Sequence, residues 1–293
     1  MNTAQDVRPA TAAGRFPLGE RGVNRIGFGT MQFPGPGVWG PSPDPVGAVA
    51  VLRKAAELGV DLFDTADSYG PEVAEDLLRE ALWGGRGNPY DGITIATKAG
   101  LMRTGPGQWH PCGRPDYLRQ QCELSLRRLG VERIDLFQLH RIDPTVPADE
   151  QFGALAALRA EGKIDQVGLS EVGIGEIERA RTVVEVATVQ NRYNLLDRRS
   201  DGVLRYCTEH GIGFMPWFPI ASGELAEPGG PVAEIAEKFD ATAAQVALAW
   251  LLRRSSVMLP IPGTSSLAHA EENVRAAELE LDAESVEKLD AAA

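Results

Sequence analysis

Four residues at the ends of apolar segments have the types that proton transfer requires. Asp64 ends the expected strand 61–64, and Tyr69 follows it by five residues in the loop before the next helix. Lys98 and His140 each end another short apolar segment. A tyrosine, with an ordinary pKa of about 10, acts as a general acid at neutral pH only if a nearby cation stabilises its anion. Lys98 can supply that charge and Asp64 can hold the lysine in place, while His140 can orient a carbonyl oxygen.

Each of these residues also has a structural interpretation. Acids and tyrosines in loops are usually solvated or hydrogen-bonded, a lysine at a strand end can extend its ammonium to water, and a strand-end histidine often only completes a hydrogen bond. The placement of all four residues at strand ends favours the catalytic interpretation.

Apolar segments and helical patterns alternate along the chain. One helix is expected to start with Asp44 as its N-cap and Pro45 at its first position, another opens with the capping box Thr242 to Gln245, and a final helix is expected at 282–289. The expected strands are 23–29, 61–64, 93–98, 134–140, 164–169, 186–190, 212–217 and 257–261.

Eight short strands that alternate with helices over about 250 residues predict a closed parallel barrel, because each crossover helix covers the outer face of one strand. The predicted fold is α/β, a (β/α)8 TIM barrel with an N-terminal β-hairpin near residues 15–25 and an extra C-terminal helix. A doubly wound open sheet is the alternative, but it usually has a GxGxxG turn after its first strand, and residues 27–32 lack that spacing. We therefore expect a flexible leader at 1–14 and a single domain at 15–293.

Two loops rich in glycine and proline, at 35–41 and 105–111, follow the first and third expected strands. Long loops in compact domains are more often functional than idle. We expect both loops to overhang the carboxyl ends of the strands and to bring Trp39 and Trp109 toward the substrate.

Composition and charge exclude several classes of function. The 293 residues are 43% apolar, which is ample for a core, and the net charge of −12 repels polyanions, so neither nucleic acid nor an anionic membrane surface is expected as a partner. No apolar run is long enough to cross a bilayer and the start lacks a signal-peptide pattern, so a cytoplasmic location is expected. Three cysteines without paired spacing and four scattered histidines predict neither a disulfide nor a metal site.

The ordered set of motifs resembles the aldo-keto reductase family over about residues 15–290. The motifs that carry the resemblance are Asp64-x-Ala66-x-x-Tyr69-Gly70, Lys98 after an apolar strand, Leu139-His140, Gly168-Leu169-Ser170, Val189-Gln190-Asn191-x-Tyr193-Asn194 and Ile261-Pro262-Gly263. The resemblance implies a TIM barrel and reversible hydride transfer between a nicotinamide cofactor and a carbonyl group. It makes Tyr69 the proton donor, tuned by Lys98 and Asp64. His140 becomes the group that orients the carbonyl.

The resemblance also implies a site for the nicotinamide end of the cofactor. Ser170 and Gln190 match positions that hold the carboxamide in the family, and Trp217 falls where an aromatic ring stacks on the nicotinamide. Glu171 departs from the pattern, because many relatives have asparagine there, and a carboxylate can only accept hydrogen bonds.

The other end of the implied cofactor site lies near the last barrel helix. Gly263, Thr264 and Ser265 lead into this helix, whose free N–H groups and dipole suit a phosphate. The lysine near Gly263 and the arginine near His269 that grip the extra phosphate of NADPH in many relatives are absent here. NADPH is the expected cofactor and NADH is the alternative. Two further residues, Glu272 and Asn273, match positions that touch adenine in the family.

The sequence around residues 31–41, together with Phe218-Pro219 and residues 261–266, is similar to the bacterial pyridoxal reductase (pyridoxine dehydrogenase) branch of that family. This similarity implies an aromatic aldehyde such as pyridoxal as the substrate. Because this chain keeps His140, unlike some of that branch, a general aldehyde or a sugar-type carbonyl stays open as an alternative.

A second class of function is a cofactor-binding, redox-sensing regulatory subunit with little turnover, like the channel-associated relatives within the family. The sequence offers no obvious segment for binding such a partner, which favours the enzyme. We expect a small-molecule carbonyl substrate and a monomer or weak homo-oligomer.

Overall fold

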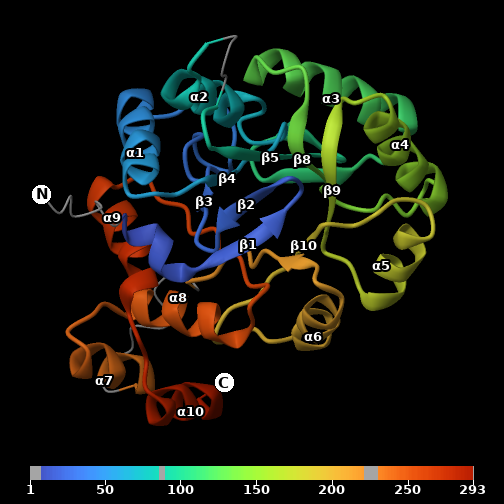
Figure 1. The fold of residues 1–293 in the computed structure, drawn as a ribbon. Coiled ribbons are helices and arrows are strands. Elements are labelled where there is room, and N and C mark those ends of the chain that lie inside the picture. The colour runs from blue at the N-terminus through green and yellow to red at the C-terminus, as the bar shows by residue number, and fades with distance from the viewer. Residues whose placement is uncertain (1–7, 86–89, 221–229, 293) are drawn as a thin grey trace, which may run out of the picture.

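Seven short parallel strands form a curled sheet at the centre of the computed structural model, which describes residues 8–85, 90–220 and 230–292 (Figure 1). They are hydrogen-bonded in the order β11, β10, β9, β8, β5, β4, β3, and every pairing is parallel. Because all the strands run the same way, their carboxyl ends lie at one end of the sheet. The strands are β3 (Phe28–Gly29), β4 (Leu62–Asp64), β5 (Thr94–Ala99), β8 (Ile134–Leu139), β9 (Ile164–Ser170), β10 (Thr188–Gln190) and β11 (Gly213–Phe214).

The segment 257–262 lies between the two edges of this sheet. On one side the N–H of Phe214 donates to the carbonyl of Val257 (2.8 Å), and on the other the N–H of Gly27 donates to the carbonyl of Pro260 (2.9 Å). The two prolines of the segment have no N–H group, so a regular ladder cannot form on both sides. The strand predicted here is therefore in the expected place but is bonded only in part.

Glycines allow the segment to approach the first edge of the sheet closely. A Cβ on Gly29 would lie 2.8 Å from the carbonyl oxygen of Ile261, and a Cβ on Gly263 would collide with the carbonyl oxygen of Gly29. Only glycine fits at such a backbone approach. The motif Ile261-Pro262-Gly263 thus has a structural role in joining the sheet edges.

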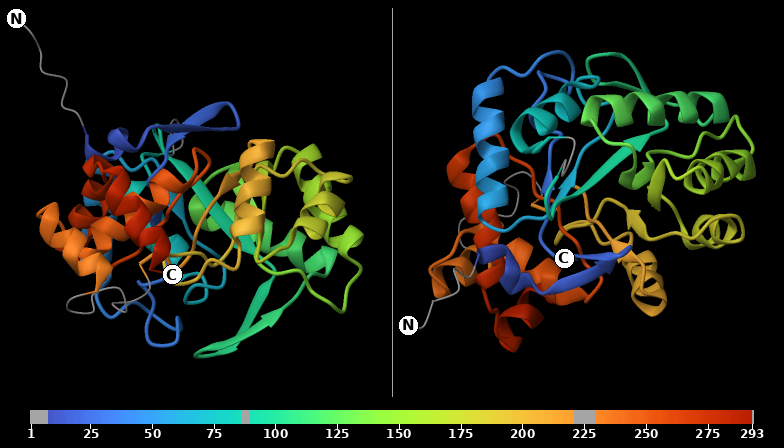
Figure 2. Two further views of the ribbon diagram at one scale, coloured as in Figure 1. Left: turned by 90° about the horizontal axis from the view of Figure 1, so that it is seen from below. Right: turned by 45° about the horizontal axis from the view of Figure 1, so that its top comes forward.

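Helices pack around the outside of the sheet (Figures 1 and 2). Both predicted helix starts are confirmed, because Asp44 Oδ1 accepts from the N–H of Gly47 (2.9 Å) and Thr242 and Gln245 form the capping box. The helix α7 was not predicted. In the described ranges, no helix is long and apolar enough to cross a membrane. The helices are α1 (Pro45–Glu57), α2 (Val73–Leu82), α3 (Pro115–Leu129), α4 (Ala148–Ala160), α5 (Ile174–Arg181), α6 (Asp201–His210), α7 (Pro231–Lys238), α8 (Ala243–Arg254), α9 (Leu267–Arg275) and α10 (Ala283–Ala291).

The predicted N-terminal hairpin is present and consists of β1 (Arg15–Leu18) and β2 (Arg21–Asn24). The strand expected at 23–29 is therefore divided between β2 and β3. Part of the expected leader is also ordered, since Pro9–Ala13 forms the 3-10 helix η1 with Ala10 buried. The packed part of the chain thus begins before residue 15.

A second hairpin, β6 (Leu101–Gly105) and β7 (Gln108–Pro111), lies at the opposite end of the sheet from the first (Figure 2). The prediction of a loop at 105–111 was wrong, because these residues belong to the hairpin. Residues 101–105 alternate between buried and exposed, which is the period of a strand, and this pattern starts before the glycines and prolines that suggested a loop.

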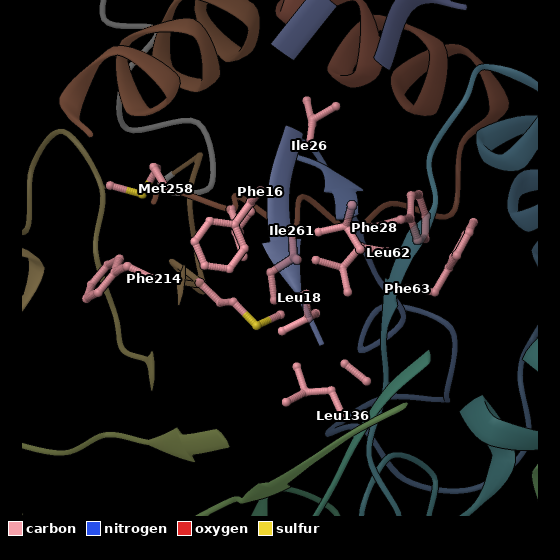
Figure 3. Close-up of a cluster of buried hydrophobic side chains, with 14 of the residues drawn as sticks. Phe16, Leu18, Ile26, Phe28, Leu62, Phe63, Leu136, Phe214, Met258 and Ile261 are labelled. Atoms are coloured by element: carbon pink, nitrogen blue, oxygen red, sulfur yellow. The ribbon is translucent and has the colours of Figure 1, made fainter. Parts of the chain in front are cut away.

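The hydrophobic core fills the interior of the sheet and continues into the first hairpin (Figure 3). Phe16 and Leu18 of β1 are buried, and a Cβ on Gly213 of β11 would touch the Phe16 ring. The first hairpin therefore closes the end of the sheet at which the strands begin. Only the carboxyl ends of the strands remain to form a site. The strand side chains in this cluster include Phe28, Leu62, Leu136 and Phe214, joined by Met258 and Ile261.

Candidate active site

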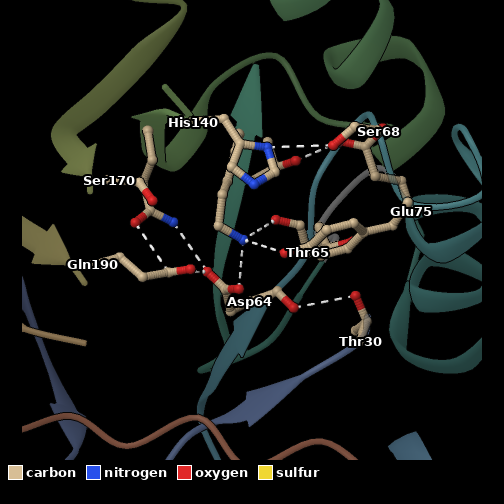
Figure 4. Close-up of polar contacts among 12 residues, drawn as sticks. Thr30, Asp64, Thr65, Ser68, Glu75, His140, Ser170 and Gln190 are labelled. Carbon is tan, nitrogen blue, oxygen red and sulfur yellow. Dashed lines mark hydrogen bonds and ion pairs between the residues drawn. The ribbon is translucent and has the colours of Figure 1, made fainter. Parts of the chain in front are cut away.

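Lys98 is fully buried at the carboxyl end of β5 and joins two other predicted site residues, of which Asp64 is labelled in Figure 4. Its Nζ donates to Asp64 Oδ1 (2.6 Å), to the Tyr69 hydroxyl oxygen (3.2 Å) and to the carbonyl of Thr65 (2.8 Å). Asp64 ends β4, which pairs with β5, so the end of one strand and the loop that follows it surround the lysine on the next. The structure thus brings Asp64 and Tyr69 together through their shared contact with Lys98.

The charges of this trio are set by burial and by each other. Burial opposes the charge on Lys98, but Asp64 and Tyr69 together outweigh burial, so the pKa of the ammonium lies above its ordinary value. Burial raises the pKa of Tyr69, and Lys98 offsets only part of this increase. Lys98 therefore lowers the pKa of Tyr69 relative to burial alone, but the net shift is upward and not the acidification that was expected. Tyr69 carries its proton at neutral pH, as a proton donor must.

Asp64 has a second set of partners that sequence analysis did not identify. Its Oδ2 accepts from Gln138 Nε2 (3.0 Å) and from Gln190 Nε2 (2.9 Å), and both amides are buried. A polar residue between Phe137 and Leu139 in an apolar strand was the available signal for Gln138. Three donors satisfy the buried carboxylate and hold it in one orientation.

His140 follows β8 and lies edge-on to Tyr69, with ring centroids 5.9 Å apart. Its Nδ1 is 3.3 Å from Ser68 Oγ, a partner that sequence analysis missed (Figure 4). Burial, reinforced by the positive charges of Lys98, Arg141 and Arg103, holds the pKa of His140 well below its ordinary value. The Ser68 contact is compatible with the neutral tautomer that carries its proton on Nε2, in which Ser68 donates to Nδ1 and Nε2 can donate to a carbonyl oxygen.

A neutral buried His140 predicts a specific pH dependence of stability. The unfolded chain binds a proton at this residue below about pH 6.5, whereas the folded chain does not until lower pH, so stability falls as the pH drops below about 6.5. We expect His140→Asn to remove up to about 1.4 kcal/mol of this loss per pH unit. Denaturant unfolding of both proteins at several pH values between neutral and mildly acidic checks this. Parallel pH profiles for both proteins would contradict it.

A cavity of about 960 Å³ opens at the carboxyl ends of the strands. It extends from Tyr69 and His140 to α9, where Ser266 Oγ accepts from the N–H of His269. Lys98 lies beneath it, and Trp39, Glu171 and Ser265 are not among its lining residues. The other predicted site residues that line it are Asp64, Trp109, Ser170, Gln190, Trp217, Gly263, Thr264, His269, Glu272 and Asn273.

Arg141 also lines this cavity and was not predicted. Its Nη1 donates to Ser170 Oγ (2.9 Å) and to the carbonyl of His140 (2.6 Å). Burial lowers the pKa of its guanidinium. It is the one arginine or lysine among the described residues that line the cavity, and it lies beside the histidine and not at α9.

The wall formed by the second hairpin is held by Arg103, a buried residue that sequence analysis also missed. Its guanidinium donates to backbone carbonyls of the loop at 35–41, of the loop that carries Tyr69 and of the second hairpin itself. The guanidinium also stacks on Trp109, 3.5 Å from the centre of the ring. Trp109 in turn lies edge-on to His140 at 6.5 Å. Arg103 therefore connects the Trp109 wall to the loop that carries Tyr69. The carbonyls are those of Gly37, Val38, Ser68 and Gln108, at 2.6 to 2.9 Å.

Replacing Arg103 should disturb the Trp109 wall of the cavity and leave the end of the cavity at α9 intact. We expect Arg103→Met to raise the KM for the expected carbonyl substrate about tenfold, equivalent to about 1.4 kcal/mol, because only the part of the lost hydrogen-bond energy that positions Trp109 acts on the substrate. The affinity for the cofactor should change little. Steady-state kinetics and cofactor titration check this, with Arg133→Met, an exposed arginine, as the control. An equal increase in the KM for the substrate and in the Kd for the cofactor would contradict the prediction.

Comparison with known protein families defines the class to which this fold and site belong. A family profile described as "Aldo/keto reductase family" matches residues 25–293. The chain belongs to this family and is an oxidoreductase, which confirms the resemblance of the ordered motifs.

Individual relatives refine this placement. The chain is 51% identical to an "uncharacterized oxidoreductase" of Schizosaccharomyces pombe, over 98% of this chain and 92% of that protein. It is 40% identical to pyridoxine 4-dehydrogenase of Escherichia coli, over 94% and 96% of the two chains. Among solved structures, an aldo-keto reductase from Klebsiella pneumoniae in complex with NADPH superposes with a TM-score of 0.80 at 28% identity, over 94% of each chain.

Proposed function

We propose that this protein reduces an aldehyde or ketone to an alcohol, reversibly and with NADPH, and that Tyr69 is the proton donor. The observation that carries the proposal is the buried contact of Lys98 with both Asp64 and the Tyr69 hydroxyl. We also infer that the curled sheet, with the segment 257–262 as its eighth member, is a (β/α)8 barrel. The hydrogen bonds from this segment to both sheet edges support that inference.

The residues around the cavity fit a dinucleotide. The cavity is at the upper end of the usual range for ligand pockets, about 300–1,000 Å³, and it connects the proton donor to the start of α9. When bound, the cofactor supplies the hydride. Ser170 and Gln190 would hold the nicotinamide end, with Trp217 stacked on its ring. Gly263, Thr264 and the first turn of α9 would hold phosphate, and His269, Glu272 and Asn273 would lie toward adenosine.

NADPH is proposed because the Klebsiella pneumoniae relative was solved with it. NADH is the second candidate. Among the described residues that line the α9 end of the cavity, His269, Glu272 and Asn273 include no lysine or arginine, so this lining offers no permanent cation to pair with an additional phosphate.

The chemistry that we assign to this chain's own residues is proton transfer to a carbonyl oxygen. His140 donates from Nε2 to the oxygen and orients it toward Tyr69, and Tyr69 then transfers its hydroxyl proton. The phenolate that remains is stabilised by the Lys98 ammonium, which already lies 3.2 Å from the oxygen. In the reverse direction the phenolate accepts the proton of an alcohol.

We propose pyridoxal or another aromatic aldehyde as the substrate. Aromatic side chains line the cavity beside the proton donor, namely Trp109 from the second hairpin and Trp217 with Phe218 after β11. The 40% identity to a pyridoxine 4-dehydrogenase supports the same class. A general aldehyde or a sugar-type carbonyl is the competing substrate.

Oxidation of NADPH and NADH by the purified protein tests the proposal against pyridoxal, an aliphatic aldehyde and a sugar aldehyde. We expect the highest kcat/KM for NADPH with pyridoxal. Cofactor binding without turnover on any carbonyl would overturn the enzyme proposal and favour a redox-sensing regulatory subunit. A higher kcat/KM for a sugar aldehyde would overturn the substrate class alone.

A further inference from the structure

Glu171 follows β9 directly and holds the edge of the Trp217 indole. Its Oε1 accepts from Trp217 Nε1 at 2.6 Å and from the backbone N–H of Arg192 at 2.6 Å. Trp217 lines the cavity, whereas Glu171 is not among the lining residues. The carboxylate therefore contacts the ring from outside the cavity.

The backbone on both sides of this contact adopts unusual conformations. Glu171 has φ +55°, and Phe218, which follows Trp217, has φ +60°. Residues other than glycine rarely adopt this left-handed backbone conformation, and they keep it only where surrounding contacts require it. The N–H of Glu171 donates to the carbonyl of Gln190 (3.0 Å), which anchors the strained residue at the strand end. The strain thus places the carboxylate against the indole N–H.

Arg192 contacts the same indole from another direction. Its guanidinium lies 5.6 Å from the centre of the Trp217 ring and 4.9 Å from that of Phe218. A salt bridge to Asp197 (3.2 Å) fixes the guanidinium. The ring of Trp217 is therefore held at its edge by Glu171 and is flanked by a cation, while it keeps a surface toward the cavity.

We propose that Glu171 is a positioning residue that fixes Trp217 for stacking on the nicotinamide ring and does not contact the cofactor itself. This inference rests on the proposed function. A carboxylate can only accept hydrogen bonds, and the indole N–H can only donate, so the pair is complementary. Holding the ring in place before binding reduces the entropy that stacking would otherwise cost.

Titration of NADPH onto the full-length protein tests this with three variants. We expect Glu171→Ala to raise the Kd about threefold to tenfold, the effect of losing one hydrogen bond of this kind. Glu171→Gln should restore most of the affinity, because its amide oxygen still accepts from the indole. The KM for the carbonyl substrate should change less than the Kd for NADPH in both variants. Glu178→Ala on α5, an exposed acid, controls for the change in charge.

A double-mutant cycle distinguishes positioning from direct contact. In a Trp217→Phe background, Glu171→Ala should have no further effect on the Kd, because the donor that Glu171 holds is gone. A loss of affinity as large in that background as in the wild type would overturn the inference, and so would an unchanged Kd for Glu171→Ala alone. If the wild-type protein binds neither NADPH nor NADH, the proposed function itself is overturned, and this inference with it.

Discussion

Tyr69→Phe is expected to lower kcat by about 10²- to 10⁴-fold, the usual contribution of a general acid, while the Kd for NADPH stays nearly unchanged. The substitution removes only the hydroxyl that lies 3.2 Å from Lys98 Nζ. The ring that packs edge-on to His140 remains. In the proposed mechanism the hydroxyl acts on the carbonyl oxygen and not on the nicotinamide, so the loss should be confined to the chemical step.

Single-turnover kinetics and cofactor titration separate these two effects. Tyr90→Phe is the matched control, because the Tyr90 hydroxyl is also buried but donates to the carbonyl of Leu129 (2.9 Å), outside the cavity. It should lose stability and keep its kcat. If Tyr69→Phe retains the wild-type kcat, Tyr69 is not the proton donor.

Lys98→Met is expected to have the largest effect on stability and to remove activity as well. Lys98 and Asp64 are 0% and 2% exposed, so loss of the ammonium leaves a buried carboxylate with only Gln138 and Gln190 as side-chain donors. Breaking a buried ion pair in this way typically costs about 3–5 kcal/mol. In the proposed mechanism the phenolate of Tyr69 also loses the charge that stabilises it.

The double variant Asp64→Asn/Lys98→Met distinguishes the two consequences. It should recover much of the free energy of unfolding, since no unpaired charge remains buried, but it should not recover kcat. Urea unfolding measures the first and steady-state kinetics the second. Lys163→Met, which breaks surface pairs with Glu123 and Glu161, is the control and should cost about 1 kcal/mol or less. Equal costs for the two lysine substitutions would contradict the prediction.

Local sequence signals predicted most of the architecture because caps and strand periods act within a few residues. The Asp44 cap and the Thr242 capping box each join atoms three residues apart, and both form as expected. Predictions failed where composition conflicted with periodicity. The second hairpin was taken for a loop because of its glycines and prolines, although residues 101–105 alternate as a strand does.

The sequence by itself determined which residue types stand at the strand ends, and parallel strands then bring Asp64, Tyr69, Lys98 and His140 to one end of the sheet. It could not show that the same carboxylate accepts from Gln138 and Gln190, which lie 74 and 126 residues further along the chain. Such contacts depend on the curvature of the whole sheet and on side-chain rotamers, which no local pattern encodes. For the same reason, only the tertiary structure shows that Glu171 contacts the Trp217 indole from outside the cavity.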